Sequence, residues 1–438
     1  MSDLEQQHRE SDFMIEQIKE RPINRKKLLR RTMTTASMAV MFGLIACITF
    51  LLLEPIISNY LYPQEKAETI IFPEESQEEE MDPEEMLTDE DVQIQNEEEQ
   101  NQTLQITVED YRTLYSTLDK YTQELSKSMV TVTGVTSDLD WFNVPYENSY
   151  QASGVIIANN NKELLVLTKA SVLEKAENIL VTFCDGSQVN AVLKGKDEQT
   201  GLAITAVTLT RMKRETKESV SVATLATSNG KNIVGSPVIA LGSPMGSSGS
   251  VNYGMITAAS SYIRMKDASY KLLTTDMAGS RNASGVLFNL QGGIVGIVSM
   301  GHTADDSEHL LTALGITELK KVIEKMSNAN DGAYFGISGQ KVAEEVHKLE
   351  GVPLGVFISD VYMDSPAMEA GLQEGDVLVS LRESSSEEPI KISDMTDFMN
   401  FLHQKKPGDK VTAVLYRMVQ DDYMEMEAEI TLSSINGE

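Results

Sequence analysis

The sequence predicts a mainly β protein with one N-terminal transmembrane helix, and three observations support that prediction. Residues 129–328 contain many short stretches rich in β-branched residues, separated by Gly, Asn, Asp and Ser, as expected for a barrel or a pair of barrels. Residues 332–435 combine further strand patterns with two short helical patterns and form a separate domain. A long uncharged apolar run lies near the N-terminus.

Residues 32–57 are predicted to form the transmembrane helix. The 22 residues between Arg31 and Glu54 carry no charge, and at about 1.5 Å rise per residue they reach roughly 33 Å, enough for a bilayer core. Residues 1–31 end in a basic stretch, so the positive-inside rule assigns them to the cytoplasm and all later domains to the outside of the cell. The alternative, a cleaved signal peptide, normally has a shorter apolar run and a small-residue cleavage site.

The net charge of -29 is concentrated in residues 64–107. From Gln64 to Asp110, eighteen Asp or Glu accompany a single Lys, so we expect a disordered, self-repelling stalk. This acidity argues against nucleic acid as a partner, because phosphate contacts need Lys and Arg. Two cysteines and no clustered His, Cys, Asp or Glu spacing give no sign of a disulfide framework, a metal site or a cofactor.

Residues 108–128 are predicted to form a short helix. Five apolar side chains recur at a 3-4-3-4 spacing, namely Tyr111, Leu114, Leu118, Tyr121 and Leu125. Such a narrow stripe is typical of a two-heptad coiled coil and would make the protein a homo-oligomer. The alternative is that the helix docks on the domain that follows it.

Nine strand patterns are spread over residues 129–328. They lie at 129–135, 152–158, 163–168, 178–183, 188–195, 202–207, 232–242, 250–259 and 292–300. An amphipathic pattern over 316–326 predicts a helix that closes this domain, and the polar segment 327–332 is predicted to link it to the next one.

Several segments together resemble the HtrA family of membrane-anchored or secreted trypsin-like serine proteases with C-terminal PDZ domains. "LGSPMGSSGSVNYGMITAA" resembles the Gly-rich loop of its protease domain, and "TTDMAGSRNASGVLFNLQGGIVGIV" the segment around its nucleophile. "YFGI" and "GVFISDVYMDSPAMEAGLQEGDVLVSL" are similar to its PDZ pattern. The resemblance implies two six-stranded antiparallel β-barrels over 129–328, with a catalytic cleft between them, and a PDZ domain over 332–435.

The family's catalytic histidine and aspartate are both missing from the matching segments. The histidine segment is "LTKASVL", in which Ser171 stands at the histidine position. The aspartate segment is "DEQTGLAITAV", in which Gly201 stands at the aspartate position. Since the mechanism needs a histidine to take the serine's proton and an aspartate to orient that histidine, the resemblance implies a catalytically degenerate member.

Ser284 is the residue that the resemblance identifies as the nucleophile, now vestigial. The usual run Gly-Asn-Ser-Gly-Gly-Pro-Leu is one residue shorter here when it is aligned on this serine, so the oxyanion region is Asn282, Ala283 and Ser284 with altered geometry. His302 and His309 lie in a polar loop beyond this segment. Lys169 is the remaining alternative base, because a Ser–Lys pair needs only a neutral amine.

The PDZ resemblance implies a site for extended C-terminal peptides, whose carboxylate is bound by backbone N–H groups. The loop in question is Tyr334, Phe335, Gly336 and Ile337. Across the groove, a helix would present residues at i, i+3 and i+7 spacing. These residues are Met395, Phe398 and Leu402. The alternative is that the three side chains only pack the PDZ core.

The sequence therefore predicts a single-pass membrane protein whose extracellular HtrA-like pseudoprotease binds peptides or the C-termini of surface or misfolded proteins. It would act as a scaffold, sensor or chaperone-like regulator, with the lipid bilayer as its second partner. The alternatives are an active serine endopeptidase in surface protein quality control and a plain structural anchor.

Overall fold

The fold is described from a computed structural model, which covers a large part of the chain. The described residues are 33–34, 36–45, 49, 68–72, 107–139, 145–302, 309–330, 332–383, 388–420 and 422–434. The chain divides into two compact units, Met1–Lys66 and Ala67–Glu438.

In the first unit, the described residues of the predicted membrane segment 32–57 are helical. Their large apolar side chains are exposed, for example Met33 at 72% and Phe42 at 78%. Within the described part of the chain, no helix combines the length and apolar character needed to cross a membrane. The rest of that segment and the predicted cytoplasmic tail lie outside the described residues.

The predicted stalk, residues 64–107, is described only at 68–72 and at 107. Ile70 exchanges two hydrogen bonds with the Asn328 side chain, at 3.1 and 2.9 Å, and Phe72 packs on the protease-fold core. This short apolar segment therefore contacts the folded domain, a contact that the prediction of a spacer did not include.

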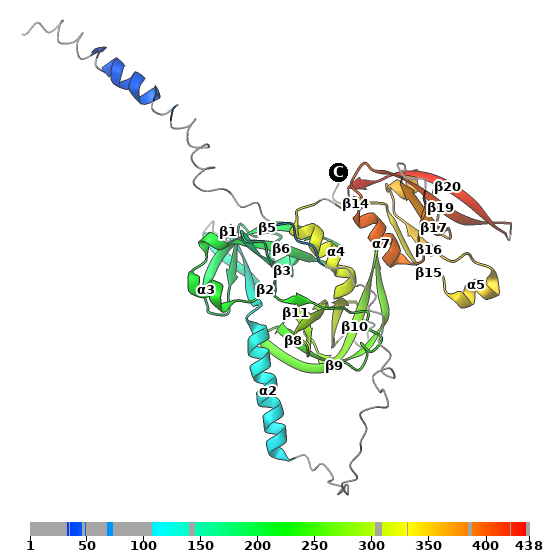
Figure 1. Cartoon of the computed structure of the whole chain (residues 1–438), viewed down its shortest axis with the longest axis horizontal. Coiled ribbons are helices and arrows are strands. Elements are labelled where there is room, and N and C mark those ends of the chain that lie inside the picture. The colour runs from blue at the N-terminus through cyan, green and yellow to red at the C-terminus, as the bar shows by residue number, and fades with distance from the viewer. Residues whose placement is uncertain are drawn as a thin grey trace, which may run out of the picture. The chain divides into compact units, whose positions relative to one another are not determined.

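The first barrel is closed and has six antiparallel strands in the order β1-β2-β3-β6-β5-β4 (Figure 1). Its strands are β1 Met129–Leu139, β2 Pro145–Asn159, β3 Glu163–Lys169, β4 Asn178–Thr182, β5 Gln188–Asp197 and β6 Leu202–Thr208. A 3-10 turn, η2 Ala170–Val172, follows β3, while η3 Leu209–Arg211 and α3 Arg214–Ser219 follow β6. β3 and β6 are buried on both faces, which explains why both read as continuous apolar runs.

The second barrel contains six strands in the order β11-β8-β9-β10-β13-β12 and closes through β11 and β12, and the short β7 adds to it in parallel. The strands are β7 Thr224–Leu225, β8 Pro237–Ser243, β9 Ser250–Met265, β10 Ala268–Ala278, β11 Ser284–Asn289, β12 Gly293–Val298 and β13 Leu310–Gly315. The two six-stranded barrels implied by the sequence are thus confirmed. β8 begins at Pro237, so the predicted strand at 232–242 was too long at its start, where Gly235 has φ +85°.

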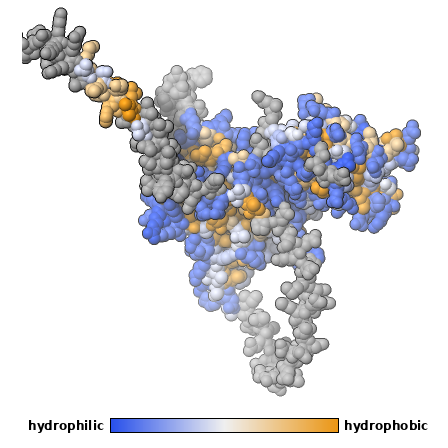
Figure 2. Space-filling view, turned by 45° about the horizontal axis from the view of Figure 1, so that its top comes forward, coloured by the Kyte–Doolittle hydropathy of each residue, from blue (hydrophilic) through white to orange (hydrophobic). Residues whose placement is uncertain are grey.

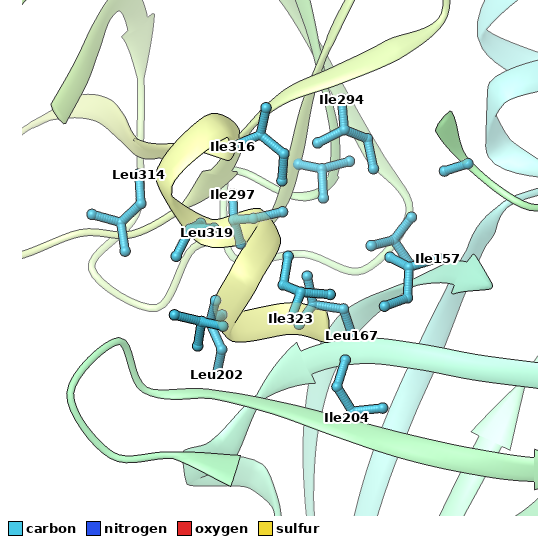
Figure 3. Packing of buried hydrophobic residues seen from close by; sticks show 14 of the residues in the cluster. Ile157, Leu167, Leu202, Ile204, Ile294, Ile297, Leu314, Ile316, Leu319 and Ile323 are labelled. Atoms are coloured by element: carbon cyan, nitrogen blue, oxygen red, sulfur yellow. The ribbon is translucent and has the colours of Figure 1, made fainter. Parts of the chain in front are cut away.

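Helix α4 (Ile316–Ser327) seals the gap between the barrels. Its buried side chains Ile316, Leu319 and Ile323 join one apolar cluster with residues of both barrels, such as Leu167 and Ile297 (Figure 3). The burial of this stripe explains the amphipathic pattern seen in the sequence. Figure 2 shows that the visible surface of the folded unit is mostly hydrophilic, with smaller apolar patches between the polar areas.

Helix α2 (Val108–Ser126) begins with a capping box in which Thr107 and Asp110 bond each other's backbone N–H groups. Its C-terminal half docks, because Tyr121 and Leu125 pack on the barrel core. Its N-terminal half leaves Tyr111 and Leu114 exposed at 58% and 54%. The docking alternative therefore describes the second half of the stripe, and self-association stays a prediction for the first half.

The C-terminal domain is a sheet with the strand order β15-β16-β17-β19-β20, with helices beside it. Its elements are β14 Ala333–Tyr334, β15 Ile337–Lys341, α5 Glu344–Glu350, β16 Val356–Val361, α6 Pro366–Glu369, β17 Val377–Glu383, β18 Ile390–Lys391, α7 Met395–His403, β19 Lys410–Val419, β20 Asp422–Thr431 and β21 Ser433–Ser434. β15 begins at Ile337 and α7 contains Met395, Phe398 and Leu402, so these two elements carry the residues predicted for the peptide site.

Candidate functional site

The cleft between the barrels contains the positions predicted for the catalytic base and its partner. Ser171 in η2 and Gly201 in the β5–β6 turn line the same cleft, which has a volume of about 490 Å³ and is closed on its other side by Ile297 and Ser299 of the second barrel. The N–H of Ala170 donates to the carbonyl of Gly201 at 2.8 Å, which ties the two segments together. The two positions predicted for the catalytic pair therefore lie together at one cleft, where serine offers a hydroxyl group and glycine has no side chain beyond hydrogen.

Ser284 is buried and does not line this cleft. It is the first residue of β11 and pairs with Ser243 of β8. Its hydroxyl accepts a hydrogen bond from the N–H of Ser153 at 3.0 Å, and the Ser153 hydroxyl lies 2.9 Å from that of Ser243. These contacts fix Ser284 as part of the packing between β2, β8 and β11.

The N–H groups of Asn282 and Ala283, in the predicted oxyanion region, are used within their own turn. The Ala283 N–H donates to the Ser280 carbonyl at 2.8 Å, and the Asn282 N–H donates to the Ser280 hydroxyl at 3.3 Å. An oxyanion hole requires preorganised donors aimed at the developing charge. In this conformation the two donors point into the loop instead.

Lys169, the alternative base, lies next to the nucleophile segment. Its ammonium donates to the carbonyl of Ala283 at 2.5 Å. Burial lowers the pKa of Lys169, because a low-dielectric surrounding disfavours the charged form. His302 and His309 are exposed, in keeping with the loop role expected for them, while His347 bonds the Val352 carbonyl inside the PDZ domain.

The predicted carboxylate-binding loop of the PDZ domain does hold a carboxylate. The N–H groups of Phe335, Gly336 and Ile337 all donate to the side chain of Asp267, which sits in the β9–β10 turn of the second barrel. Sequence reasoning missed Asp267, because a lone Asp in a two-residue turn gives no sign of its distant partner.

The three helix residues predicted to face the peptide groove lie in the PDZ core. Met395, Phe398 and Leu402 are at most 5% exposed and belong to the core cluster. Phe398 meets the ring of Phe335 edge to face, with 5.3 Å between ring centroids. The packing alternative thus describes their contacts, whereas Met399 on the same helix packs on the barrel core.

His403, at the end of α7, has two buried ring nitrogens, which the sequence did not reveal. Neither ring nitrogen has a hydrogen-bond partner among the described residues. Burial, followed by the positive charges of Lys325 and Lys321, lowers its pKa to about 3. A histidine that must stay neutral in the folded state destabilises that state as the solution becomes acidic.

We therefore expect an acid-sensitive folded state that depends on His403. The pKa of His403 in the folded state lies below its unfolded value near 6.5. The stability that the neutral His403 allows is therefore fully present above pH 6.5, and it is lost as the pH falls toward 3. Between pH 7 and pH 5, His403 should contribute a loss of about 2 kcal/mol to the free energy of unfolding, measured by urea unfolding followed by circular dichroism as the difference between the pH dependences of the wild type and His403→Leu. His403→Leu should remove that loss. Asn400→Leu, an exposed site on the same helix, should keep the wild-type pH dependence.

Comparisons with known proteins agree with this fold. A family profile described as a trypsin-like peptidase domain matches residues 152–297, and one described as a PDZ domain matches residues 325–432. Among solved structures, the HtrA-type protease AlgW with tripeptide has a TM-score of 0.51 at 21% identity and covers 73% of this chain and 98% of its own. At that identity the likeness concerns the fold alone.

Several of the relatives found by sequence carry the HtrA name. "Serine protease Do-like HtrA" of Bacillus subtilis (strain 168) is 29% identical over 288 residues, 61% of this chain and 61% of the relative. "Serine protease HtrA-like" of Staphylococcus aureus (strain MRSA252) is 26% identical over 326 residues, 69% of this chain and 40% of the relative. The chain thus spans less than two thirds of the length of these curated relatives. Because both domain profiles match in this order and the relatives are HtrA proteins, the chain belongs to the HtrA family.

Proposed function

We propose that this protein is a pseudoprotease that acts by binding peptides or protein C-termini through its PDZ domain, as a scaffold, sensor or chaperone-like regulator. The observation that carries the proposal is that Ser171 and Gly201, the positions that the resemblance assigns to the base and its orienting carboxylate, line one cleft and offer neither group. The burial of Ser284 and the internal bonding of the Asn282 and Ala283 N–H groups support it.

A different register of the nucleophile loop strengthens the proposal. Aligned on Leu287, the run Gly-Asn-Ser-Gly-Gly-Pro-Leu fits without any deletion and matches Asn282, Gly285 and Leu287. Its serine then falls on Ala283, and Ser284 takes the position of the first glycine. Alanine has no hydroxyl to attack a carbonyl, so in this register the nucleophile is missing together with the base.

The rival function is an active serine endopeptidase in surface protein quality control, with which the comparisons are equally compatible. The closeness of Lys169 to the nucleophile segment favours it, because a desolvated amine can serve as the base of a Ser–Lys pair. Against it, the Lys169 ammonium donates to the Ala283 carbonyl and Ser284 receives its hydrogen bond from Ser153. Labelling by a fluorophosphonate probe separates the two functions, since only an activated serine reacts.

Peptide binding tests the proposal directly. We expect the purified full-length protein to bind a fluorescein-labelled pool of decapeptides with apolar C-terminal residues, and to bind the amidated pool about tenfold or more weakly, since a hydrogen bond to a charged group contributes about 1.5–3 kcal/mol. Fluorescence polarisation measures both affinities. Equal affinities for the two pools would exclude a carboxylate-binding groove, and no binding to either pool would favour the structural anchor.

We further propose that residues 32–57 anchor the protein in the cell membrane, with residues 1–31 in the cytoplasm and both domains outside. The six Lys and Arg residues between Arg21 and Arg31 support this orientation. Protease added to intact cells should therefore remove the folded domains, as detected with an antibody to the PDZ domain. Protection in intact cells and loss only after permeabilisation would reverse the orientation.

A further inference from the structure

The Asp267 side chain lies in the PDZ loop in the manner of a bound carboxylate. Its Oδ2 accepts from the Phe335 N–H at 2.6 Å, its Oδ1 from the Ile337 N–H at 2.9 Å, and both oxygens from the Gly336 N–H, at 2.7 and 2.9 Å. Three consecutive backbone donors on one carboxylate form the kind of nest with which PDZ domains capture a peptide's C-terminus. The donors are therefore already satisfied within the chain.

The loop can hold a carboxylate only because of Gly336. This residue has φ +99°, and a Cβ at its position would lie 2.1 Å from the Cβ of Ser365. The left-handed backbone turns the neighbouring N–H groups toward one point. The geometry is thus built for an anion, and the anion present is Asp267.

Asp267 also pairs through its backbone as a peptide would. Its N–H donates to the carbonyl of Ile337 at 2.7 Å, the first residue of β15. Addition of an extended segment to this edge is how PDZ domains bind their ligands. One residue of the barrel thus supplies both the carboxylate and the main-chain contact.

The rest of the β9–β10 hairpin contacts both walls of the PDZ groove. On β15, Gln340 accepts a hydrogen bond from Arg264 at 2.5 Å. On α7, the Met399 sulfur accepts from the Ser269 N–H at 3.4 Å. Beside the loop, the Lys266 ammonium lies 5.1 Å from the centre of the Tyr362 ring. The approach of β10 to β15 and α7 can be followed in Figure 1.

Asp267 carries the charge that the loop is built for. It is 5% exposed, and an ionised carboxylate at such a site needs several donors to offset its desolvation. Burial raises its pKa to about 6, although the three amides and the positive charge of Lys325 oppose that shift. The side chain is therefore ionised at neutral pH, as a peptide's C-terminus would be.

We propose that Asp267 is an internal ligand of the PDZ domain, so that a peptide carboxylate enters the loop only after the β9–β10 hairpin has left it. The inference rests on the proposed peptide-binding function. When Asp267 occupies the loop, a peptide cannot bind there. The apparent affinity for a peptide is then the intrinsic affinity multiplied by the fraction of molecules whose groove is open. It also couples peptide binding to movement of a hairpin that belongs to the second barrel.

Asp267→Gly in the full-length protein is the sharpest test. Asp267 has φ +55° in its turn, and glycine adopts that conformation while removing the carboxylate. Asp409→Asn is the matched control, because that carboxylate accepts a single PDZ N–H, from Lys406, in an exposed turn. Asp267→Asn is the second variant, since Asn tolerates the same backbone and keeps one acceptor.

Two measurements are made on each variant. Hydrogen exchange of the segment 335–337 reports the docking without any ligand, and we expect about tenfold or faster exchange in Asp267→Gly, a smaller increase in Asp267→Asn, and the wild-type rate in Asp409→Asn. Fluorescence polarisation with the free-carboxylate decapeptide pool should show about tenfold or tighter binding to Asp267→Gly than to the wild type.

The outcomes separate the inference from the proposed function. Unchanged exchange at 335–337 in Asp267→Gly would overturn the inference. So would faster exchange with equal peptide affinity in the wild type and the variant, because the peptide would then not compete with the hairpin. Faster exchange with no peptide bound by any variant would uphold Asp267 as the occupant of the loop and refute the peptide-binding function.

Discussion

The purified full-length protein is expected to leave unfolded casein intact under conditions in which a protease with a complete Ser-His-Asp triad degrades it. Loss of the base alone costs about 10⁶ in turnover in such sites, because the members of the triad act as a unit. A rate enhancement of roughly 10³–10⁴ over the reaction in water remains in such sites, and it comes from the oxyanion hole and from substrate binding. Here the Asn282 and Ala283 N–H groups bond Ser280, so that remainder is reduced too.

Ser284→Ala is the matched control for this prediction, and it should change neither casein cleavage nor fluorophosphonate labelling. If Ser284→Ala abolished a measured proteolysis, the pseudoprotease proposal would be refuted. Casein cleavage by Lys169→Met would then show whether Lys169 is the base. The same loss in Lys169→Met would establish a Ser–Lys pair, whose lysine pKa is already lowered by burial.

Rebuilding the triad separates the two registers of the nucleophile loop. Ser171→His with Gly201→Asp restores the base and its partner, and the Cβ added at residue 201 meets no atom within 4 Å. Since Ser284 is buried, we expect this double variant to stay inactive. Adding Ala283→Ser supplies a hydroxyl at the position that the deletion-free register identifies, but Ala283 is fully buried as well, so we expect the triple variant to stay inactive too. Activity in the double variant alone would favour Ser284 as the vestigial nucleophile.

The second large effect is expected at Phe398. This side chain is fully buried and packs edge to face on Phe335, which precedes Gly336 in the carboxylate loop. Phe398→Ala should cost about 3–5 kcal/mol of PDZ stability, from lost burial and the cavity left behind. Chemical denaturation of the full-length protein measures the loss. Met424→Ala, at a position that is 56% exposed on β20, should stay within about 0.5 kcal/mol of the wild type.

Phe398→Ala also decides between the two roles that the sequence allowed for this helix. A residue that packs the core lowers stability and peptide binding together. A residue that only lines the groove weakens binding of the decapeptide pool while the unfolding midpoint stays unchanged. The second result would contradict the packing seen in the structure.

Local sequence patterns predicted all six strands of the first barrel but only β8, β9 and β12 of the second, so the second barrel and the missing catalytic pair were predicted through the family resemblance. The strand at 202–207 and the helix at 316–326 are encoded by side chains only a few positions apart, whose spacing reflects which faces are buried. The absence of a histidine at 171 and of an aspartate at 201 is likewise visible in the sequence alone, because a side chain that is not encoded cannot act.

Contacts between distant segments were decided only by the tertiary structure. Ser284 resembles a nucleophile in sequence, but its hydroxyl is buried because β11 packs on β2, 131 residues earlier. Asp267 lies 69 residues before Gly336, and no periodicity relates a hairpin turn to a loop of another domain. The N-terminal apolar run was by itself sufficient to predict a membrane helix, because that prediction depends only on the length of the run and not on contacts with other segments. What occupies the PDZ loop depends instead on how two folded domains meet, because a carboxylate bonds whichever N–H groups the fold brings to it.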